Sequence, residues 1–275
     1  TGATTISAGT LQLMSANALS ASSGLFMDNG TQLDMGGFNQ AIASLSGGGE
    51  VLIGGASLSI GGSDASGSFS GVISGSGSVT KSGAGTLGLF GPNSFSGAMN
   101  ALGGTLFVSS SASLGDGSAT NTLTLDGATL QTFGTVASPA SRAVVIGGAG
   151  GTVNTSGNAV TFAGNVSGTG GLTKTGAGTL TLSGNNTRSG YTDIEQGRLS
   201  LQNGNALADD ARVTIADLAG AGLDVATSET IGSLAGGGSS GGDVTLSNAA
   251  TLNVGGDDSS TIFAGSITGG GSLVK

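Results

Sequence analysis

The chain has 275 residues and a formal net charge of −9, and 57 of its residues are glycine. Cysteine and histidine are absent, which excludes a disulfide framework, a thiolate metal site and histidine-dependent catalysis. The acidic balance argues against nucleic-acid binding, because phosphate contacts need clustered lysine and arginine, and a hydrophobic fraction of 37% favours a folded chain over disorder.

Pairs of apolar residues with a spacing of two recur from one end of the chain to the other. Each pair lies in a short run rich in threonine, serine and valine, and glycine, asparagine, aspartate or serine bounds the run. This pattern is typical of half-buried β-strands separated by turns. In chain order the pairs are Leu11/Leu13, Leu33/Met35, Leu58/Ile60, Leu87/Leu89, Leu106/Val108, Leu123/Leu125, Leu180/Leu182, Leu199/Leu201, Val213/Ile215, Val244/Leu246 and Leu252/Val254.

The distance between successive pairs predicts the architecture. Leu33 follows Leu11, and Leu106 follows Leu87, each after a similar length of chain. An advance of about 22 residues per coil is typical of a β-solenoid, in which equivalent strands stack from coil to coil. We therefore predict an all-β parallel β-helix of roughly twelve coils, forming a single continuous body over residues 1–275.

A longer repeat is superimposed on the coils. Each of three lysines follows a phenylalanine by twelve residues, in the pairs Phe69 and Lys81, Phe162 and Lys174, and Phe263 and Lys275. A second marker is a glycine before a Thr-Leu or Arg-Leu pair, at Gly9, Gly104 and Gly197. These markers predict approximate repeat units over residues 1–96, 97–189 and 190–275, and we expect the chain to be part of a longer array.

Two sets of side chains in this repeat have predicted structural roles. The recurring phenylalanines are expected to stack in the core as one column. The alternative is a glycan-stacking platform made by the phenylalanines and Tyr191. Glycine at the coil corners supplies positive φ, and Asn93, Asn185 and Asn186 are expected to do the same.

The segment Lys174-Thr-Gly-Ala-Gly-Thr-Leu-Thr-Leu-Ser-Gly-Asn-Asn-Thr-Arg-Ser-Gly-Tyr-Thr-Asp-Ile-Glu-Gln-Gly-Arg-Leu-Ser-Leu201 resembles the passenger-associated transport repeat of bacterial autotransporters, also called the autotransporter-associated β-strand repeat. Residues 81–108 form a poorer copy, residues 1–13 resemble the tail of another, and Lys275 begins one more. The motif positions are Lys81, Gly83, Gly85 and Leu87 in one copy, and Lys174, Gly176, Gly178, Leu180, Leu182, Asn185 and Asn186 in the other.

This resemblance implies a right-handed parallel β-helix, extracellular at a Gram-negative cell surface, and either anchored to the outer membrane or secreted. It implies type V secretion, with export by the Sec route and a C-terminal outer-membrane β-barrel translocator that we expect to lie outside this fragment. The expected partners are neighbouring β-helix repeats and that translocator, and other passengers or surface glycans are further candidates. In the family the repeat is associated with efficient passenger translocation, and coils that fold outside the cell are suggested to hinder back-sliding.

Carboxylates are the remaining candidates for chemistry. The segment Gly255-Gly-Asp-Asp-Ser-Ser260 resembles the adjacent aspartate pairs of β-helical polysaccharide hydrolases, but a turn capped by one aspartate explains it more simply. Asp116, Asp257 and Asp258 are candidate calcium ligands, because calcium prefers carboxylate oxygens. We predict no enzyme activity, no catalytic residue and no cofactor.

The main functional hypothesis is structural. It is a stalk or passenger segment of a cell-surface autotransporter that supports outer-membrane translocation and presents an adhesive or autoaggregating region. The alternative is a glycan- or protein-binding adhesin module in its own right, for which the acidic last unit is the first place to look. A β-helical polysaccharide-active enzyme ranks third.

Overall fold

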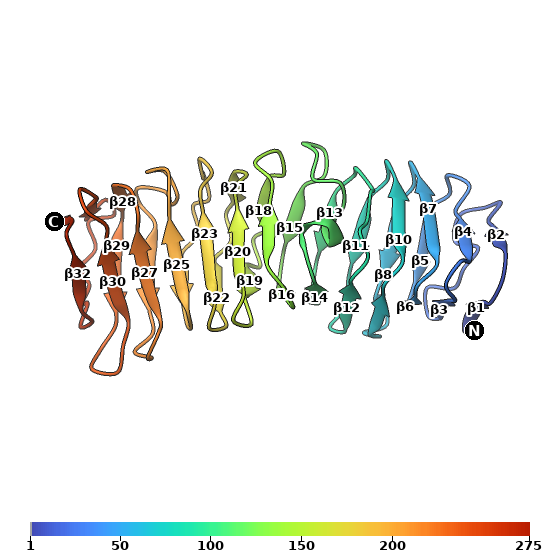
Figure 1. The fold of residues 1–275 in the computed structure, drawn as a ribbon, viewed down its shortest axis with the longest axis horizontal. Coiled ribbons are helices and arrows are strands. Elements are labelled where there is room, and N and C mark those ends of the chain that lie inside the picture. Colours follow the sequence, from blue (N-terminus) through green and yellow to red (C-terminus); the bar gives the residue numbers. More distant parts are fainter. Residues whose placement is uncertain (1) are drawn as a thin grey trace. The chain divides into compact units, whose positions relative to one another are not determined.

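The computed structural model describes residues 2–275. Within that range the chain consists of short β-strands and one 3-10 helix, η1 (Ser111–Leu114). The strands wind through about 13 turns of a parallel β-solenoid (Figure 1), so the predicted all-β solenoid is confirmed. Residues 2–275 contain no helix with the length and hydrophobicity needed to cross a bilayer.

The chain divides into two compact units, Thr1–Gln131 and Thr132–Lys275, called unit 1 and unit 2 below. Strand β16 (Ala128–Thr132) contains the boundary. The single continuous body and the three repeat units of the sequence remain predictions about the organisation of the chain.

Unit 1 contains three stacks of parallel strands, which follow one another around the coils that contain all three. The first stack is β1 (Thr4–Ile6), β3 (Gly24–Met27), β6 (Ser44–Gly47), β9 (Gly67–Phe69), β12 (Thr86–Leu89) and β14 (Gly104–Val108). The second is β2 (Thr10–Gln12), β4 (Gln32–Asp34), β7 (Glu50–Gly54) and β10 (Val72–Gly75). The third is β5 (Gln40–Ile42), β8 (Leu58–Ile60), β11 (Val79–Lys81), β13 (Met99–Ala101) and β15 (Leu123–Leu125).

Unit 2 is built in the same way. One stack is β19 (Gly151–Asn154), β22 (Leu172–Thr175), β24 (Thr192–Ile194), β26 (Arg212–Ile215) and β29 (Ser233–Gly236). The next is β17 (Val136–Ser138), β20 (Ala159–Phe162), β23 (Thr179–Leu182), β25 (Arg198–Leu201), β27 (Gly222–Val225), β30 (Asp243–Leu246) and β32 (Ile267–Gly269). Two shorter stacks are β18 (Val144–Ile146) with β21 (Val166–Gly168), and β28 (Glu229–Ile231) with β31 (Thr251–Val254) and β33 (Ser272–Val274).

The core is made of aliphatic columns that run from coil to coil. On β23, Leu180 is fully buried, whereas the neighbouring Thr179 and Thr181 are half-buried and face outward. Leu180 lies opposite Leu199, and Leu199 lies opposite Leu223. The alternating pattern of the sequence places one apolar residue per strand in each column. Burying each leucine contributes about 2 kcal/mol to the stability of the fold.

Two motif glycines occupy corners that accept no other residue without a shift. Gly83 has a φ of 68°, and a Cβ atom there would lie 2.0 Å from the carbonyl oxygen of Gly61. Gly176 has a φ of 75°, and a Cβ atom there would lie 2.5 Å from Oδ1 of Asn154. Both the backbone conformation and the close approach of the preceding coil therefore require glycine.

The expectation that Asn93, Asn185 and Asn186 adopt positive φ is wrong. In the described chain, the non-glycine residues with positive φ are Asn17, Asp64, Ser156, Asn203, Ala249 and Asp258. Asn93 and Asn186 are instead buried, and their side-chain amides bind backbone groups of other coils.

The recurring phenylalanines do not stack on one another. Phe69 is buried and lies opposite Leu89 in the next coil of unit 1, and Phe162 is buried and lies opposite Leu182 in unit 2. Phe263 is only half-buried. Phe69 lies on β9 and Phe162 lies on β20, which belong to different strand stacks, and Phe263 pairs with Gly236. The three phenylalanines therefore do not form one column.

Candidate functional site

Each full copy of the repeated motif buries a lysine. Lys81 ends β11, and its side chain is fully enclosed. Its Nζ donates hydrogen bonds to the carbonyl oxygens of Ser82 and Gly83, each at 2.7 Å, and to that of Gly103 at 3.2 Å. Burial lowers the pKa of Lys81, and the carboxylate of Asp64 opposes this by favouring the ammonium form.

Lys174, on β22, repeats this arrangement in unit 2. Its Nζ donates to the carbonyl oxygens of Thr175 at 2.8 Å, Gly176 at 2.7 Å and Gln196 at 2.9 Å. Burial lowers the pKa of Lys174 to about 8. An ammonium has three N–H donors and finds three carbonyl acceptors here. We call each such set of three carbonyls a lysine cradle.

Each lysine cradle joins two coils. Gly103 follows Lys81 by 22 residues, and Gln196 follows Lys174 by 22 residues. That distance is about one coil, so the ammonium ties its own corner to the corner of the following coil.

Asn186 connects three coils of unit 2 through the interior. Its Oδ1 accepts a hydrogen bond from the backbone N–H of Val166 at 2.7 Å, and its Nδ2 donates to the carbonyl oxygen of Ala206 at 2.7 Å. Both partners are 20 residues away, one before and one after. The amide therefore satisfies a backbone donor on one side and a backbone acceptor on the other.

Asn93 makes the same pair of bonds in unit 1. Its Oδ1 accepts from the backbone N–H of Ile73 at 2.8 Å, and its Nδ2 donates to the carbonyl oxygen of Ser113 at 2.7 Å. The two motif copies thus share a lysine cradle and a bridging asparagine, and both devices satisfy buried backbone groups where a strand ladder is interrupted.

Glu229 continues the interior polar contacts of unit 2, and sequence reasoning missed it. Its Oε2 accepts from the backbone N–H of Ala206 at 3.1 Å, and its Oε1 accepts from that of Leu207 at 2.9 Å. Burial raises the pKa of Glu229, the two backbone bonds oppose this rise, and the carboxylate of Asp209 adds to it. No periodicity marks this residue, because its role depends on the coil before it.

Arg188 is a buried cation that the sequence analysis missed. Its Nη1 donates to the carbonyl oxygens of Gly170, Gly190 and Tyr191 at 3.0, 2.6 and 2.8 Å, and its Nη2 donates to Oγ1 of Thr192. Burial lowers its pKa to about 10.

Alignment of the two motif copies could have indicated that Arg188 is buried. When Lys174 is aligned with Lys81, Arg188 and Thr192 fall on the positions of Phe95 and Met99. Phe95 and Met99 are fully buried. An apolar pair in unit 1 therefore becomes a hydrogen-bonded polar pair in unit 2.

The predicted calcium candidates act as turn residues. Oδ1 of Asp116 accepts from the backbone N–H of Ser118 at 2.9 Å. Asp257 accepts from the hydroxyl of Ser233 at 2.7 Å and from the backbone N–H of Ser259 at 3.0 Å, and these bonds hold the pKa of Asp257 below its usual range. Within residues 2–275, no three acidic side chains gather as a metal site would require.

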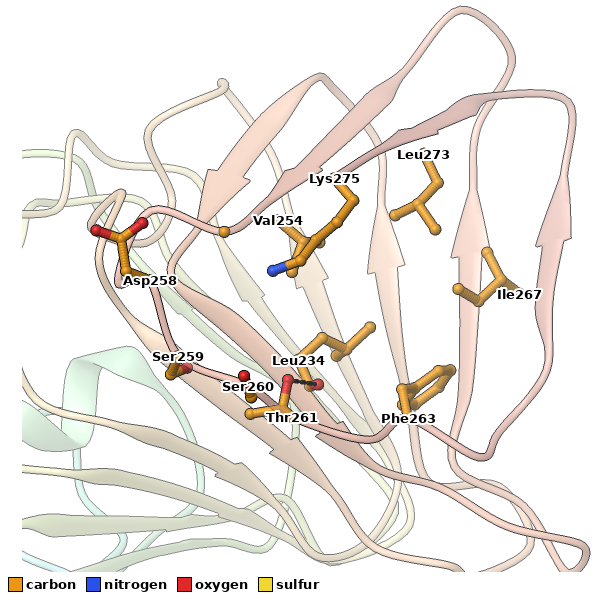
Figure 2. A pocket seen from close by; sticks show the side chains of 11 residues that line it. Leu234, Val254, Asp258, Ser259, Ser260, Thr261, Phe263, Ile267, Leu273 and Lys275 are labelled. Carbon is orange, nitrogen blue, oxygen red and sulfur yellow. Dashed lines mark hydrogen bonds between the residues drawn. The ribbon is translucent and has the colours of Figure 1, made fainter.

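A pocket of about 640 Å³ lies among the last coils of unit 2 (Figure 2). Leu234, Phe263 and Leu273 line it together with Asp258 and Lys275. Figure 2 shows Asp258, Ser259 and Ser260 at one side of the pocket, and Phe263, Ile267 and Leu273 at the other. Asp257 is held away from this lining by its serine partners, so the adjacent aspartates do not face one reaction centre, as a pair of catalytic carboxylates would.

Comparison with known proteins identifies a repeat family in the regions that contain the lysine cradles and the bridging asparagines. The Passenger-associated-transport-repeat family model matches residues 1–13, 79–108 and 172–201, ranges that contain both lysine cradles and both bridging asparagines. The chain is also similar to an adhesin, BmaC autotransporter, from Brucella suis biovar 1 (strain 1330), with 36% identity over 254 residues. That alignment covers 88% of this chain but only 7% of the relative.

No solved structure matches the chain. In the two longer matched ranges, the buried lysine and the buried asparagine recur with partners at equivalent positions. The chain therefore carries passenger-associated transport repeats, and it is similar over most of its length to part of an autotransporter adhesin.

Proposed function

We propose that this chain is a structural segment that supports translocation of its passenger across the outer membrane and spaces an adhesive region from the cell. The similarity to an autotransporter adhesin supports a cell-surface or extracellular, non-enzymatic passenger. The same similarity implies a C-terminal translocator as a partner. Adhesion by the whole protein is part of the proposal, since the chain spans a small part of the named relative.

The lysine cradle is the observation that carries this proposal. Lys174 reaches Thr175 and Gly176 within its own corner, but it reaches Gln196 only when the following coil is in place. The cradle therefore favours the folding of one coil onto the next, and it needs no ligand, metal or disulfide to do so.

This property suits a chain that crosses a narrow pore unfolded. In the extended chain, the ammonium and the carbonyls are hydrated, whereas in the folded coils they bind one another. Each coil that folds outside the cell buries further leucine columns and makes return of the chain less favourable. The repeat thus contributes to directional movement through coil-by-coil stability.

Deletion of residues 97–189 tests the proposal in the full-length protein that contains this chain. The deletion joins Ser96 to Gly190, and Ser96 and Ser189 occupy the same position after their motif lysines, so the motif register is kept. Surface display is measured by antibody labelling, and adhesion is normalised to displayed protein. We expect display to fall and adhesion per displayed molecule to stay the same.

A full-length variant with Lys81→Met and Lys174→Met separates coil closure from length. We expect it to lower surface display while leaving the length of the stalk unchanged. If display is normal in both variants and adhesion is lost in the deletion, the segment serves recognition and the structural proposal is wrong.

A further inference from the structure

One outward face of unit 2 carries a cluster that a spacer does not require. Asp193 lies on β24 and Thr214 lies opposite it on β26. Their strand neighbours on both sides point into the core, so these two side chains face outward. Together with Glu195 and Arg212 they line a hollow of about 420 Å³, which Ile194 and Ala216 complete.

The arginine of this cluster is held in position by an aromatic ring. Cζ of Arg212 lies 5.3 Å from the ring centroid of Tyr191, a cation–π distance. On the other side of β24, the ring covers Gly171, where a Cβ atom would lie 2.3 Å from Cζ of Tyr191. Since β24 pairs with β22 on one side and with β26 on the other, Tyr191 is flanked by Gly171 and Arg212. Tyr191 is therefore a positioning residue rather than an open stacking platform.

Two of the polar side chains that line the hollow, Arg212 and Asp193, form no hydrogen bond with each other. Nη2 of Arg212 lies 3.8 Å from Oδ1 of Asp193, too far for a hydrogen bond. Oδ1 of Asp193 is buried and has no hydrogen-bond donor, so a ligand reaches only the exposed remainder of the Asp193 side chain, together with the exposed Glu195. The hollow thus presents two carboxylates that accept hydrogen bonds, a guanidinium that donates them and a threonine hydroxyl that does both.

This set of groups selects a class of ligand by its chemistry. The ligand must bring O–H donors and oxygen acceptors close together, and adjacent hydroxyls of a sugar ring supply both. The two carboxylates exceed the single guanidinium, and the chain has a net charge of −9, so sulfated or sialylated glycans are repelled. We propose that the cluster of Asp193, Glu195, Arg212 and Thr214 binds an uncharged glycan through vicinal hydroxyls.

Comparison with the other motif copy shows that this cluster is local. Tyr191, Asp193 and Glu195 occupy the positions that Ala98, Asn100 and Leu102 occupy after Lys81. The lysine cradle and the bridging asparagine are the same in both copies. The scaffold is therefore shared and the outward groups differ, as expected where a recognition site is added to a structural repeat. This inference goes beyond the proposed role in translocation and spacing.

Glycan binding by the purified 275-residue chain tests the proposal. The probes are immobilised neutral oligosaccharides ending in glucose, galactose, mannose or fucose, with sulfated and sialylated glycans and an oligolysine peptide for comparison. We expect binding to at least one neutral glycan, with little dependence on salt, because no ion pair with the ligand is needed. We expect Asp193→Asn and Arg212→Gln each to weaken that binding about tenfold, the effect of losing one charge-assisted hydrogen bond.

Matched variants make the outcome interpretable. Asp193→Asn introduces the residue that Asn100 already provides in the other copy, so we expect it to fold, and circular dichroism and thermal unfolding check this. Asn100→Ala and Leu102→Ala are the controls in unit 1, and they are expected to leave glycan binding unchanged.

Three results would overturn the proposal. They are the absence of binding to all the neutral glycans, binding that Asp193→Asn and Arg212→Gln leave unchanged, and binding to oligolysine alone with loss at high salt. The last result would identify an acidic patch for cationic peptides. Surface display of Asp193→Asn in the full-length protein is expected to be normal, so failure of the glycan site is distinguishable from failure of the role in translocation.

Discussion

The ammonium nitrogen of Lys174 lies 2.9 Å from the carbonyl oxygen of Gln196, a residue 22 positions further along the chain. Lys81 and Gly103 stand in the same relationship at 3.2 Å. Each bond joins one coil to the next through the interior. The solenoid is therefore held together at the motif by buried polar contacts as well as by its aliphatic columns.

Replacing a cradle lysine should destabilise the fold. Lys174→Met keeps a long apolar side chain but leaves the carbonyls of Thr175, Gly176 and Gln196 without this donor. We expect a loss of about 2 kcal/mol in the free energy of unfolding, measured by urea denaturation. The control is Thr173→Met on the outward face of β22, expected to change stability by less than about 0.5 kcal/mol. Equal effects of the two substitutions would contradict the role of the cradle.

The lysine should also give the protein a pH dependence at alkaline pH. Burial lowers the pKa of Lys174 to about 8 in the folded chain, from the ordinary lysine value of 10.5. Between these values the unfolded chain binds more protons, so the free energy of unfolding rises with pH. Relative to Lys174→Met, the wild type should therefore gain stability as the pH is raised from about 8 to 10.5. A difference between the two proteins that stays constant over this range would rule out the lowered pKa.

The bridging asparagine should tolerate neither an apolar nor an acidic substitute. Asn186→Leu leaves the N–H of Val166 and the carbonyl of Ala206 unpaired, and we expect a loss of about 3 kcal/mol. Asn186→Asp keeps an acceptor for Val166 but loses the donor to Ala206, and acidification should partly restore stability by protonating the carboxylate.

The matched control for Asn186 is its neighbour. Asn185 is exposed, so Asn185→Leu is expected to change the free energy of unfolding by less than about 0.5 kcal/mol. A large effect at Asn185 together with a small effect at Asn186 would show that the turn, rather than the interior bridge, is important.

Glu229 should give the free energy of unfolding a pH dependence of opposite sign in the acidic range. Its folded-state pKa lies above 4.5 because burial disfavours the carboxylate. The folded protein therefore binds this proton more tightly than the unfolded chain, and stability from this group increases as the pH falls towards 4.5. Urea midpoints of wild type and Glu229→Gln, compared from neutral pH to pH 4.5, should shift in favour of the wild type. A shift in favour of the variant would mean that the bonds from Ala206 and Leu207 outweigh burial.

The buried polar pair of Arg188 and Thr192 in unit 2 can be replaced by the apolar pair that unit 1 has at the same motif positions. Arg188→Phe should be strongly destabilising, because the carbonyls of Gly170 and Gly190 lose their donor. Adding Thr192→Met recreates the pair formed by Phe95 and Met99 in unit 1. We expect the double variant to recover part of the loss, which a double-mutant cycle measures as a coupling of about 1 kcal/mol. Simple additivity of the two substitutions would show that the pair is not a packing unit.

The class of fold follows from the sequence alone, because a two-residue alternation of apolar side chains encodes strands regardless of their partners. The step of about 22 residues then indicates stacked coils. Glycine at Gly83 and Gly176 could also be anticipated, since only glycine adopts those corner conformations readily.

The roles of the polar motif residues, in contrast, emerge only from the folded coils. Asn186 looks like a turn residue in the sequence, yet its amide bridges Val166 and Ala206 in the coils on either side. Arg188 and Glu229 look like surface charges but are buried against backbone groups. The partners of Asn186 and Glu229, and Gly170 among the partners of Arg188, lie about one coil away along the chain. Burial and pairing of these side chains therefore depend on the register between coils, which no local pattern contains.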